Sequence, residues 1–183
     1  MTIYNVDLKD FNRALSVSIG DRETCAYFPD NDTKFAYVPI SWNRQELFSQ
    51  YGIIGYKLYY DAEEGGGVII GGPDDLSFLI MTPFSNYDMS EYIISKLVEY
   101  LSTKFDNVSV DGNDILISNN KVIGTAGAIV NDMSIFMFMA TFEDNTTIIN
   151  ELCPPRHGKI PTHIDTSILT KQELKEKIVE WLQ

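Results

Sequence analysis

Two short segments constrain this chain more than any other part of its sequence. Residues 65–76 read GGGVIIGGPDDL, and residues 113–126 read NDILISNNKVIGTA. Because glycine has no Cβ, three glycines in a row let the backbone turn tightly or approach a ligand closely. β-favouring residues dominate the second segment, which predicts two strands joined by a turn at Asn119-Asn120. A ligand-binding loop followed by a hairpin is one interpretation, and two ordinary hairpins is the other.

A helix is predicted between the two segments. Asp88 with Glu91 three residues later matches the capping-box signature of a helix start. Apolar residues then recur at helical spacing, at Ile94, Leu97, Val98, Leu101 and Phe105. Thr170 with Glu173 repeats the signature, so the chain is expected to end on an amphipathic helix.

The remaining patterns predict a mixture of strands and helices. Strands are predicted at 23–28, 34–38, 55–60, 76–81, 107–111, 114–118, 121–130 and 133–142, and short helices at 7–16, 43–50 and 146–152. No strict βαβ rhythm is present, which favours an α+β fold with helices packed on a mixed, largely antiparallel sheet. A chain of 183 residues can bury a core without staples, so we expect one domain over residues 1–183.

Composition excludes several classes of protein. A net charge of −12 repels a phosphate backbone, so nucleic acid is not an expected partner. Two cysteines, Cys25 and Cys153, are too few for a disulfide framework or a zinc site. Charged residues interrupt the first 19 positions, so neither a signal peptide nor a membrane span is expected there, and a cytoplasmic protein is.

Lys121 and the small residues after it form the first candidate site. Gly124 and Ala126 share one face of the predicted strand, where small side chains leave room for a thin ligand. Strict alternation places Lys121 on the opposite face, so a bulge near Gly124 or a wrapped ligand is needed to bring the lysine to that surface. An ordinary solvated lysine is the alternative interpretation.

Other polar residues allow both a structural and a functional interpretation. Asn113 and Asp114 suit a turn, and Cys153 suits either a buried core position or a nucleophile whose pKa a cation lowers. His157 and His163 lack the spacing of a metal pair. An acidic group could bind a cation but is more typical of a solvated face, and no metal is expected at Asp61, Glu63, Glu64, Asp74 and Asp75.

In their order along the chain, these segments resemble the lipoate–protein ligase and octanoyltransferase superfamily. The ligase motif Ser-Gly-Gly-Gly-Ala-Val matches at Gly65, Gly66, Gly67 and Val68, and the transferase motif at Gly72, Pro73 and Leu76. Both branches continue with Asn-Asp on a strand and then a Lys-Val/Ile-x-Gly-x-Ala segment. That continuation is matched by Asn113, Asp114, Lys121, Val122, Gly124 and Ala126.

The resemblance implies a fold, a ligand and roles for these residues. The family fold is a mixed-sheet α+β domain that holds a lipoyl or octanoyl chain in a groove beside the glycine loop. By resemblance Lys121 is the cation at the reacting carboxyl, and the acyl group passes to a lysine of a lipoyl carrier domain. Ligases use ATP with magnesium and lipoate, whereas transferases take the acyl group from an acyl carrier protein through a Cys/Lys dyad, here Cys153 with Lys121.

Three functions remain open because the chain departs from both branches. Acidic residues replace the arginines expected before the glycines, and Gly71 replaces a histidine. Carboxylates repel a triphosphate, which weighs against ATP chemistry. The alternatives are an ATP-dependent lipoate ligase, an ATP-independent Cys/Lys transferase, and an inactive relative that binds an acyl group or a protein.

Overall fold

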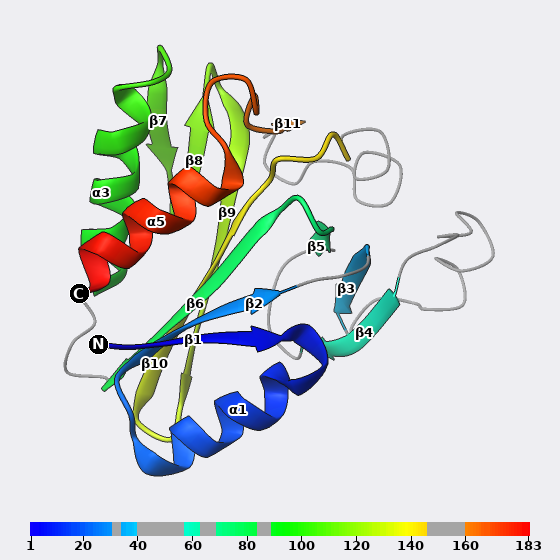
Figure 1. The fold of residues 1–183 in the computed structure, drawn as a ribbon, viewed down its shortest axis with the longest axis vertical. Helices are drawn as coiled ribbons and strands as arrows, with labels where there is room; N and C mark the ends of the chain where they lie inside the picture. Colours follow the sequence, from blue (N-terminus) through cyan, green and yellow to red (C-terminus); the bar gives the residue numbers. More distant parts are fainter. Residues whose placement is uncertain (31–33, 40–56, 63–68, 84–88, 146–159) are drawn as a thin grey trace.

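A mixed, largely antiparallel sheet forms the centre of the structure, a computed structural model that describes residues 1–30, 34–39, 57–62, 69–83, 89–145 and 160–183 (Figure 1). Its strand order is β1-β2-β6-β10-β9-β8-β7, with β11 beside β9. The strands are β1 Thr2–Asp7, β2 Cys25–Asp30, β6 Leu76–Pro83, β7 Val108–Asp111, β8 Asp114–Ile117, β9 Asn120–Val130, β10 Met133–Ala140 and β11 Ile160–Pro161. The predicted fold class is confirmed.

A second, smaller sheet lies beside the first and has the order β4-β3-β5. Its strands are β3 Phe35–Pro39, β4 Lys57–Ala62 and β5 Ile69–Gly71. The strand β5 ends one residue before Gly72, and the turn that follows leads directly into β6 of the main sheet. This small sheet therefore connects the glycine-rich stretch to the main sheet.

The helices of the described residues, α1, α3 and α5, cover the two faces of the main sheet (Figure 1). On one face, α3 Met89–Ser102 and α5 Lys171–Leu182 pack over the larger core, which contains Phe78, Phe138 and Ile80. On the other face, α1 Leu8–Asp21 contributes Ala14 and Ile19 to a smaller cluster. We call this second face the α1 face.

The helices α3 and α5 form where the sequence predicts them, although Asp88, the predicted cap of α3, lies outside the described residues. In α3 the fully buried residues Ile93, Leu97 and Leu101 recur every four positions, which is the spacing of one helix face. At the start of α5, Thr170 and Glu173 form a complete capping box. Both local signals therefore agree with the packing.

Several boundaries differ from the prediction. The strand β1 was not predicted, and α1 runs over residues 8–21 rather than 7–16. The turn between β8 and β9 uses Ser118 and Asn119, with φ of 51° and 67°, rather than Asn119-Asn120. Asn120 already pairs with Ile117 in the sheet. The helices predicted at 43–50 and 146–152 lie outside the described residues.

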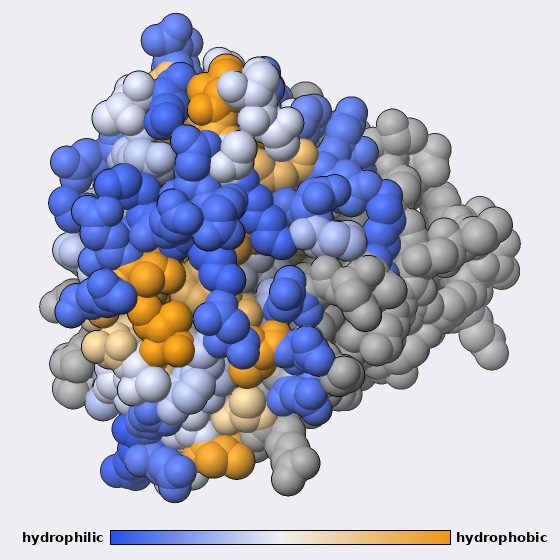
Figure 2. All heavy atoms as spheres, viewed as in Figure 1, coloured by the Kyte–Doolittle hydropathy of each residue, from blue (hydrophilic) through white to orange (hydrophobic). Residues whose placement is uncertain are grey.

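The described surface seen in Figure 2 is predominantly hydrophilic, with small scattered apolar patches. Among the helices that the structure describes, none is both long enough and apolar enough to cross a membrane.

Candidate functional site

A bulge in β9 brings Lys121 onto the α1 face together with Gly124. Leu116 of β8 pairs with Lys121, but the preceding residue Ile115 pairs with Ile123, so Val122 is an extra residue on β9. An extra residue breaks the two-residue alternation of a strand, and positions 121 and 124 then share one face. Of the two ways in which Lys121 could meet the small residues, a bulge or a wrapped ligand, the structure therefore contains the bulge.

The side chain of Lys121 lies across Gly124. A Cβ built on Gly124 would stand 2.9 Å from the Cε and 3.1 Å from the Nζ of Lys121. No side chain larger than hydrogen fits there without displacing the lysine. The missing side chain of Gly124 therefore leaves the space that the Lys121 ammonium occupies.

Asp114 holds the ammonium from the neighbouring strand. Its Oδ1 lies 3.1 Å from Lys121 Nζ and also accepts a hydrogen bond from the backbone N–H of Thr125 at 3.3 Å. Thr125 Oγ1 in turn donates to the backbone carbonyl of Asn113 at 3.0 Å. The side chain of Lys121 keeps 35% of its surface exposed and that of Asp114 only 16%. The ammonium is thus fixed but accessible.

An apolar strip leads away from the Lys121 ammonium along the α1 face. Gly124 pairs with Met139 of β10, and Ala126 pairs with Met137. Met137 is 36% exposed although β10 is an inner strand, and Ala126 is also exposed. Small residues beside flexible thioethers form a surface that can receive a thin apolar chain. The sequence-predicted residues Lys121, Asp114, Asn113, Gly124 and Ala126 are therefore together at one place.

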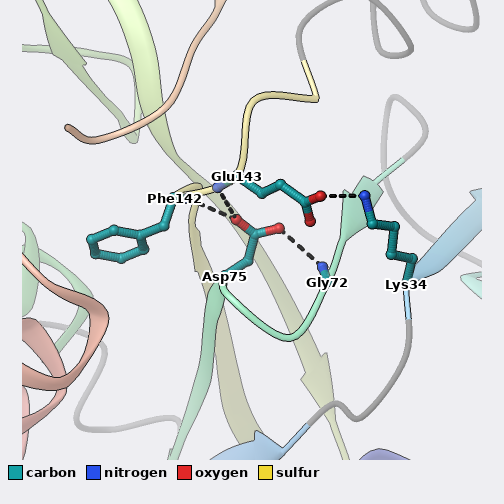
Figure 3. Close-up of polar contacts among 5 residues, drawn as sticks. All are labelled: Lys34, Gly72, Asp75, Phe142 and Glu143. Atoms are coloured by element: carbon teal, nitrogen blue, oxygen red, sulfur yellow. Dashed lines mark hydrogen bonds and ion pairs between the residues drawn. The ribbon is translucent and has the colours of Figure 1, made fainter. Parts of the chain in front are cut away.

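Gly72 occupies a separate corner, where β5 leads into β6 (Figure 3). The buried carboxylate of Asp75 accepts hydrogen bonds from the backbone N–H groups of Gly72, Phe142 and Glu143 at 2.9, 2.7 and 3.0 Å. Burial raises the pKa of Asp75, and these three N–H donors oppose the rise. Asp75 therefore joins the start of β6 to the segment that follows β10.

An ion pair closes the same corner from the small sheet. Lys34 Nζ pairs with Glu143 Oε1, and the other carboxylate oxygen of Glu143 lies 2.7 Å from where a Gly72 Cβ would stand. The missing side chain of Gly72 therefore makes room for Glu143. The structure gives Gly72 a packing role here, and its predicted role in ligand binding stays a prediction. Neither Lys34 nor Glu143 was singled out in the sequence, since no motif marks them.

Most of the remaining candidates cannot be placed relative to either group. Gly65, Gly66, Gly67, Val68 and Cys153 lie outside the described residues, so their predicted roles stay predictions. Cys25 is a free, fully buried cysteine whose pKa is raised by burial. His163 lies 3.9 Å from Asp144. Within the described ranges, no group of three or more His, Cys, Asp or Glu side chains is placed to hold a metal ion.

The chain matches no protein-family model and no curated protein sequence, whereas many solved structures share its fold. LipL1 of Plasmodium falciparum, solved with lipoate, superposes with a TM-score of 0.69 at 16% identity, over 99% of this chain and 60% of that protein. A bipartite lipoate–protein ligase of Thermoplasma acidophilum, studied with its E2 lipoyl domain, superposes with a TM-score of 0.66 at 14% identity. The match covers 98% of this chain and 82% of that protein. A lipoate–protein ligase A bound with ATP superposes with a TM-score of 0.63 at 15% identity, and the match covers 98% of this chain and 83% of that protein.

Biotin protein ligases are also among the similar structures. At sequence identities of 12–16%, the structural likeness shows that the fold is shared. It confirms the resemblance to the ligase superfamily at the level of fold. The chain spans 60% of the length of the Plasmodium protein.

Proposed function

We propose that this chain, which has the fold of the lipoate– and biotin–protein ligases, is a lipoate-ligase-like acyltransferase that attaches a lipoyl or octanoyl group to a lysine of a carrier domain. The observation that carries the proposal is the Lys121 ammonium, held across Gly124 by Asp114 at the head of an apolar strip. An acyl chain lying on that strip would place its carbonyl group beside the ammonium.

The reaction requires one bond to form and one to break at the acyl carbonyl carbon. The neutral amine of the acceptor lysine attacks this carbon, and the bond to the leaving group, a phosphate oxygen or a thiol sulfur, breaks. The proton lost by the amine ends on the leaving group or in solvent. A fixed ammonium stabilises the negative charge that develops on the carbonyl oxygen and leaving group. Lys121 supplies that charge, and Asp114 orients it.

The described residues fit an acyl chain better than a triphosphate. Lys121 faces Asp114, and Lys34 faces Glu143, so each of these cations is matched by a carboxylate. A triphosphate would meet little net positive charge at either place. The phosphate leaving group, and with it the use of ATP, therefore belongs to one arm of the test, and the thiol leaving group belongs to the other. The second candidate function is an inactive relative that binds an acyl group. The pairing of each cation with a carboxylate favours it, because little positive charge is left to stabilise a transition state.

Mass spectrometry of a carrier domain tests these functions. The protein is incubated with an apo lipoyl domain and either lipoate with ATP and magnesium or an octanoyl carrier thioester. Transfer is expected in one arm, and an acyl adduct on Cys153 would identify the thiol-dependent transferase. Lys121→Met is expected to reduce the rate by about 100-fold, the effect of losing one transition-state charge.

A matched control separates the charge from the general effect of removing a lysine. Lys96 has the same exposed fraction as Lys121, 35%, and also pairs with a carboxylate, that of Glu99. Lys96→Met should leave transfer unchanged. If neither arm yields transfer while calorimetry shows octanoate binding, the protein is the acyl-binding relative. Octanoate binding that Lys121→Met leaves unchanged would rule out the Lys121 strip as the acyl site.

A further inference from the structure

The segment after β11, which lies beside β9, carries His163 past Lys121 (Figure 1). The Thr162 N–H donates a hydrogen bond to the backbone carbonyl of Lys121 at 2.9 Å. Two residues later, the Ile164 N–H donates to the carbonyl of Thr141, just after β10, at 2.7 Å. The backbone is therefore held on both sides of His163, once by β9 and once by the residue that follows β10.

His163 stands on the α1 face, as Lys121 does. Residues that pair directly across two strands point to the same face, and Pro161 of β11 pairs with Lys121. Alternation then places His163, two residues after Pro161, on this face as well. Ile164 agrees with this assignment, because it is fully buried in the larger core on the opposite face. As a diagonal neighbour, His163 lies roughly 7–8 Å from Lys121 between Cα atoms, a separation that long side chains span.

The imidazole of His163 has an acidic partner and also contact with solvent. Its Nδ1 lies 3.9 Å from Asp144 Oδ1, and the His163 side chain is 39% exposed. Asp165 also interacts with His163, but its Oδ1 accepts the N–H and the hydroxyl of Ser167, at 2.9 and 2.7 Å. With Nδ1 directed at Asp144, Nε2 is the nitrogen left for another molecule. A histidine oriented by a carboxylate is the usual arrangement of a general base, and its contacts are often long before substrate binds.

The carboxylates of the candidate site and of the corner at Gly72 are already engaged. Asp114 holds the Lys121 ammonium, and its side chain is only 16% exposed. Glu143 is paired with a lysine, and Asp75 is buried beneath three N–H donors. A group that takes a proton from an incoming amine must be accessible to that amine. His163 is accessible and is a neighbour of Lys121.

We propose that His163 accepts the proton of the acceptor lysine as its amine attacks the acyl carbonyl carbon beside Lys121. The inference rests on the proposed function and adds the base of that reaction. At neutral pH a lysine is mostly in its ammonium form, which has no lone pair for the attack. As the nitrogen–carbon bond forms and the bond to the leaving group breaks, His163 Nε2 takes the amine proton. It then returns this proton to the leaving thiolate, or to solvent when the leaving group is a phosphate.

Two acceptors of different basicity separate a base from a structural residue. The apo lipoyl domain presents a lysine that is protonated at pH 7, whereas hydroxylamine is neutral there and needs no base to become nucleophilic. His163→Gln keeps a polar side chain that takes up no proton. Its transfer to the lipoyl domain is expected to be about 100-fold slower, while its transfer to hydroxylamine and its octanoate binding are unchanged. Lys121→Met should slow both transfers.

The two acidic residues near His163 provide a matched pair of variants. Asp144→Asn is expected to slow transfer to the lipoyl domain about fivefold, because an exposed ion pair orients the imidazole only weakly. Asp165→Asn should leave the rate unchanged, since the amide oxygen can still accept the Ser167 N–H. Equal slowing by the two variants would contradict the role of Asp144.

The rates of the parent and of His163→Gln decide between the outcomes. If His163→Gln acylates the lipoyl domain at the parent rate, the inference is overturned and the proposed function stands. A loss of equal size with the lipoyl domain and with hydroxylamine would also overturn it, because His163 would then only shape the site. If the parent transfers no acyl group to either acceptor, the proposed function fails and the inference falls with it.

Discussion

Gly72 and Asp75 hold together the backbone segments that meet where β5 leads into β6. Gly72 has no side chain to contribute, yet its missing Cβ is what lets the Glu143 carboxylate approach and pair with Lys34. Asp75 fixes the same position by accepting the N–H groups of both Gly72 and Glu143. The corner therefore depends on close approach of backbone segments rather than on apolar contact.

Gly72→Ala is expected to lower the free energy of unfolding by about 1 kcal/mol, because the new methyl displaces the Glu143 carboxylate from its buried position. Urea unfolding measures the change. Gly20→Ala is the control: a Cβ there meets nothing within 4 Å, and removing a helical glycine should stabilise the protein by about 0.5–1 kcal/mol. Destabilisation of similar size in both variants would contradict the steric explanation.

At the scale of elements, a polar cluster fastens α1 to the first two strands. Tyr4 of β1 donates to both oxygens of Glu23, at 2.8 and 3.0 Å, just after α1 ends. Ser18 of α1 lies 2.5 Å from the hydroxyl of Tyr27 on β2. The bond from Tyr4 lowers the pKa of Glu23, while Glu23 raises the pKa of Tyr4 to about 12. The charged form of Glu23 is thus the one that the fold prefers.

Tyr4→Phe is expected to lower the urea concentration at the unfolding midpoint at pH 7, since it removes the hydrogen bond that Tyr4 donates to the Glu23 carboxylate. Glu23 has a folded pKa below its unfolded value, so its stabilisation is present above about pH 4.5 and is lost as the pH falls through the folded pKa. The difference between parent and variant should shrink toward pH 3 in urea unfolding. Tyr92→Phe, at an exposed tyrosine of α3, should show no difference at either pH.

Local signals in the sequence predicted the elements that depend on local physics. The helix ending the chain carries its own cap at Thr170, and the apolar spacing of α3 needs no partner to be recognised. The strand β1 was missed because its pattern is broken by polar residues and it is held by pairing with β2. The extra residue Val122 depends on the register of β8, so the sequence left a bulge and a wrapped ligand as alternatives. Glu143 meets Lys34 across 109 positions, which no motif encodes.

At the scale of the whole molecule, negative charge dominates. Acidic residues outnumber basic ones by 26 to 14, and several lysines are already paired with carboxylates on the described surface. A net charge of this size destabilises the compact state through self-repulsion. Dissolved ions screen this repulsion, so the stability of the folded protein is expected to depend on salt concentration.

Raising sodium chloride from about 0.01 to about 0.1 M shortens the screening length from roughly 30 to 10 Å. The melting temperature at pH 7 is expected to rise by a few degrees, as measured by calorimetry. At pH 5, nearer the isoelectric point of about 4.4, the salt effect should be smaller. A fall in melting temperature with salt would mean that the surface ion pairs outweigh the overall repulsion.

The unequal pairing of β9 has a consequence for its motion. Residues 120, 121 and 123 pair with a strand on each side, whereas residues 125–130 pair with β10 alone among the described strands. Local opening should therefore require less free energy toward the hairpin tip than near Lys121, as a gradient within one strand. The end that holds the ammonium is therefore expected to exchange its amide hydrogens more slowly than the hairpin tip.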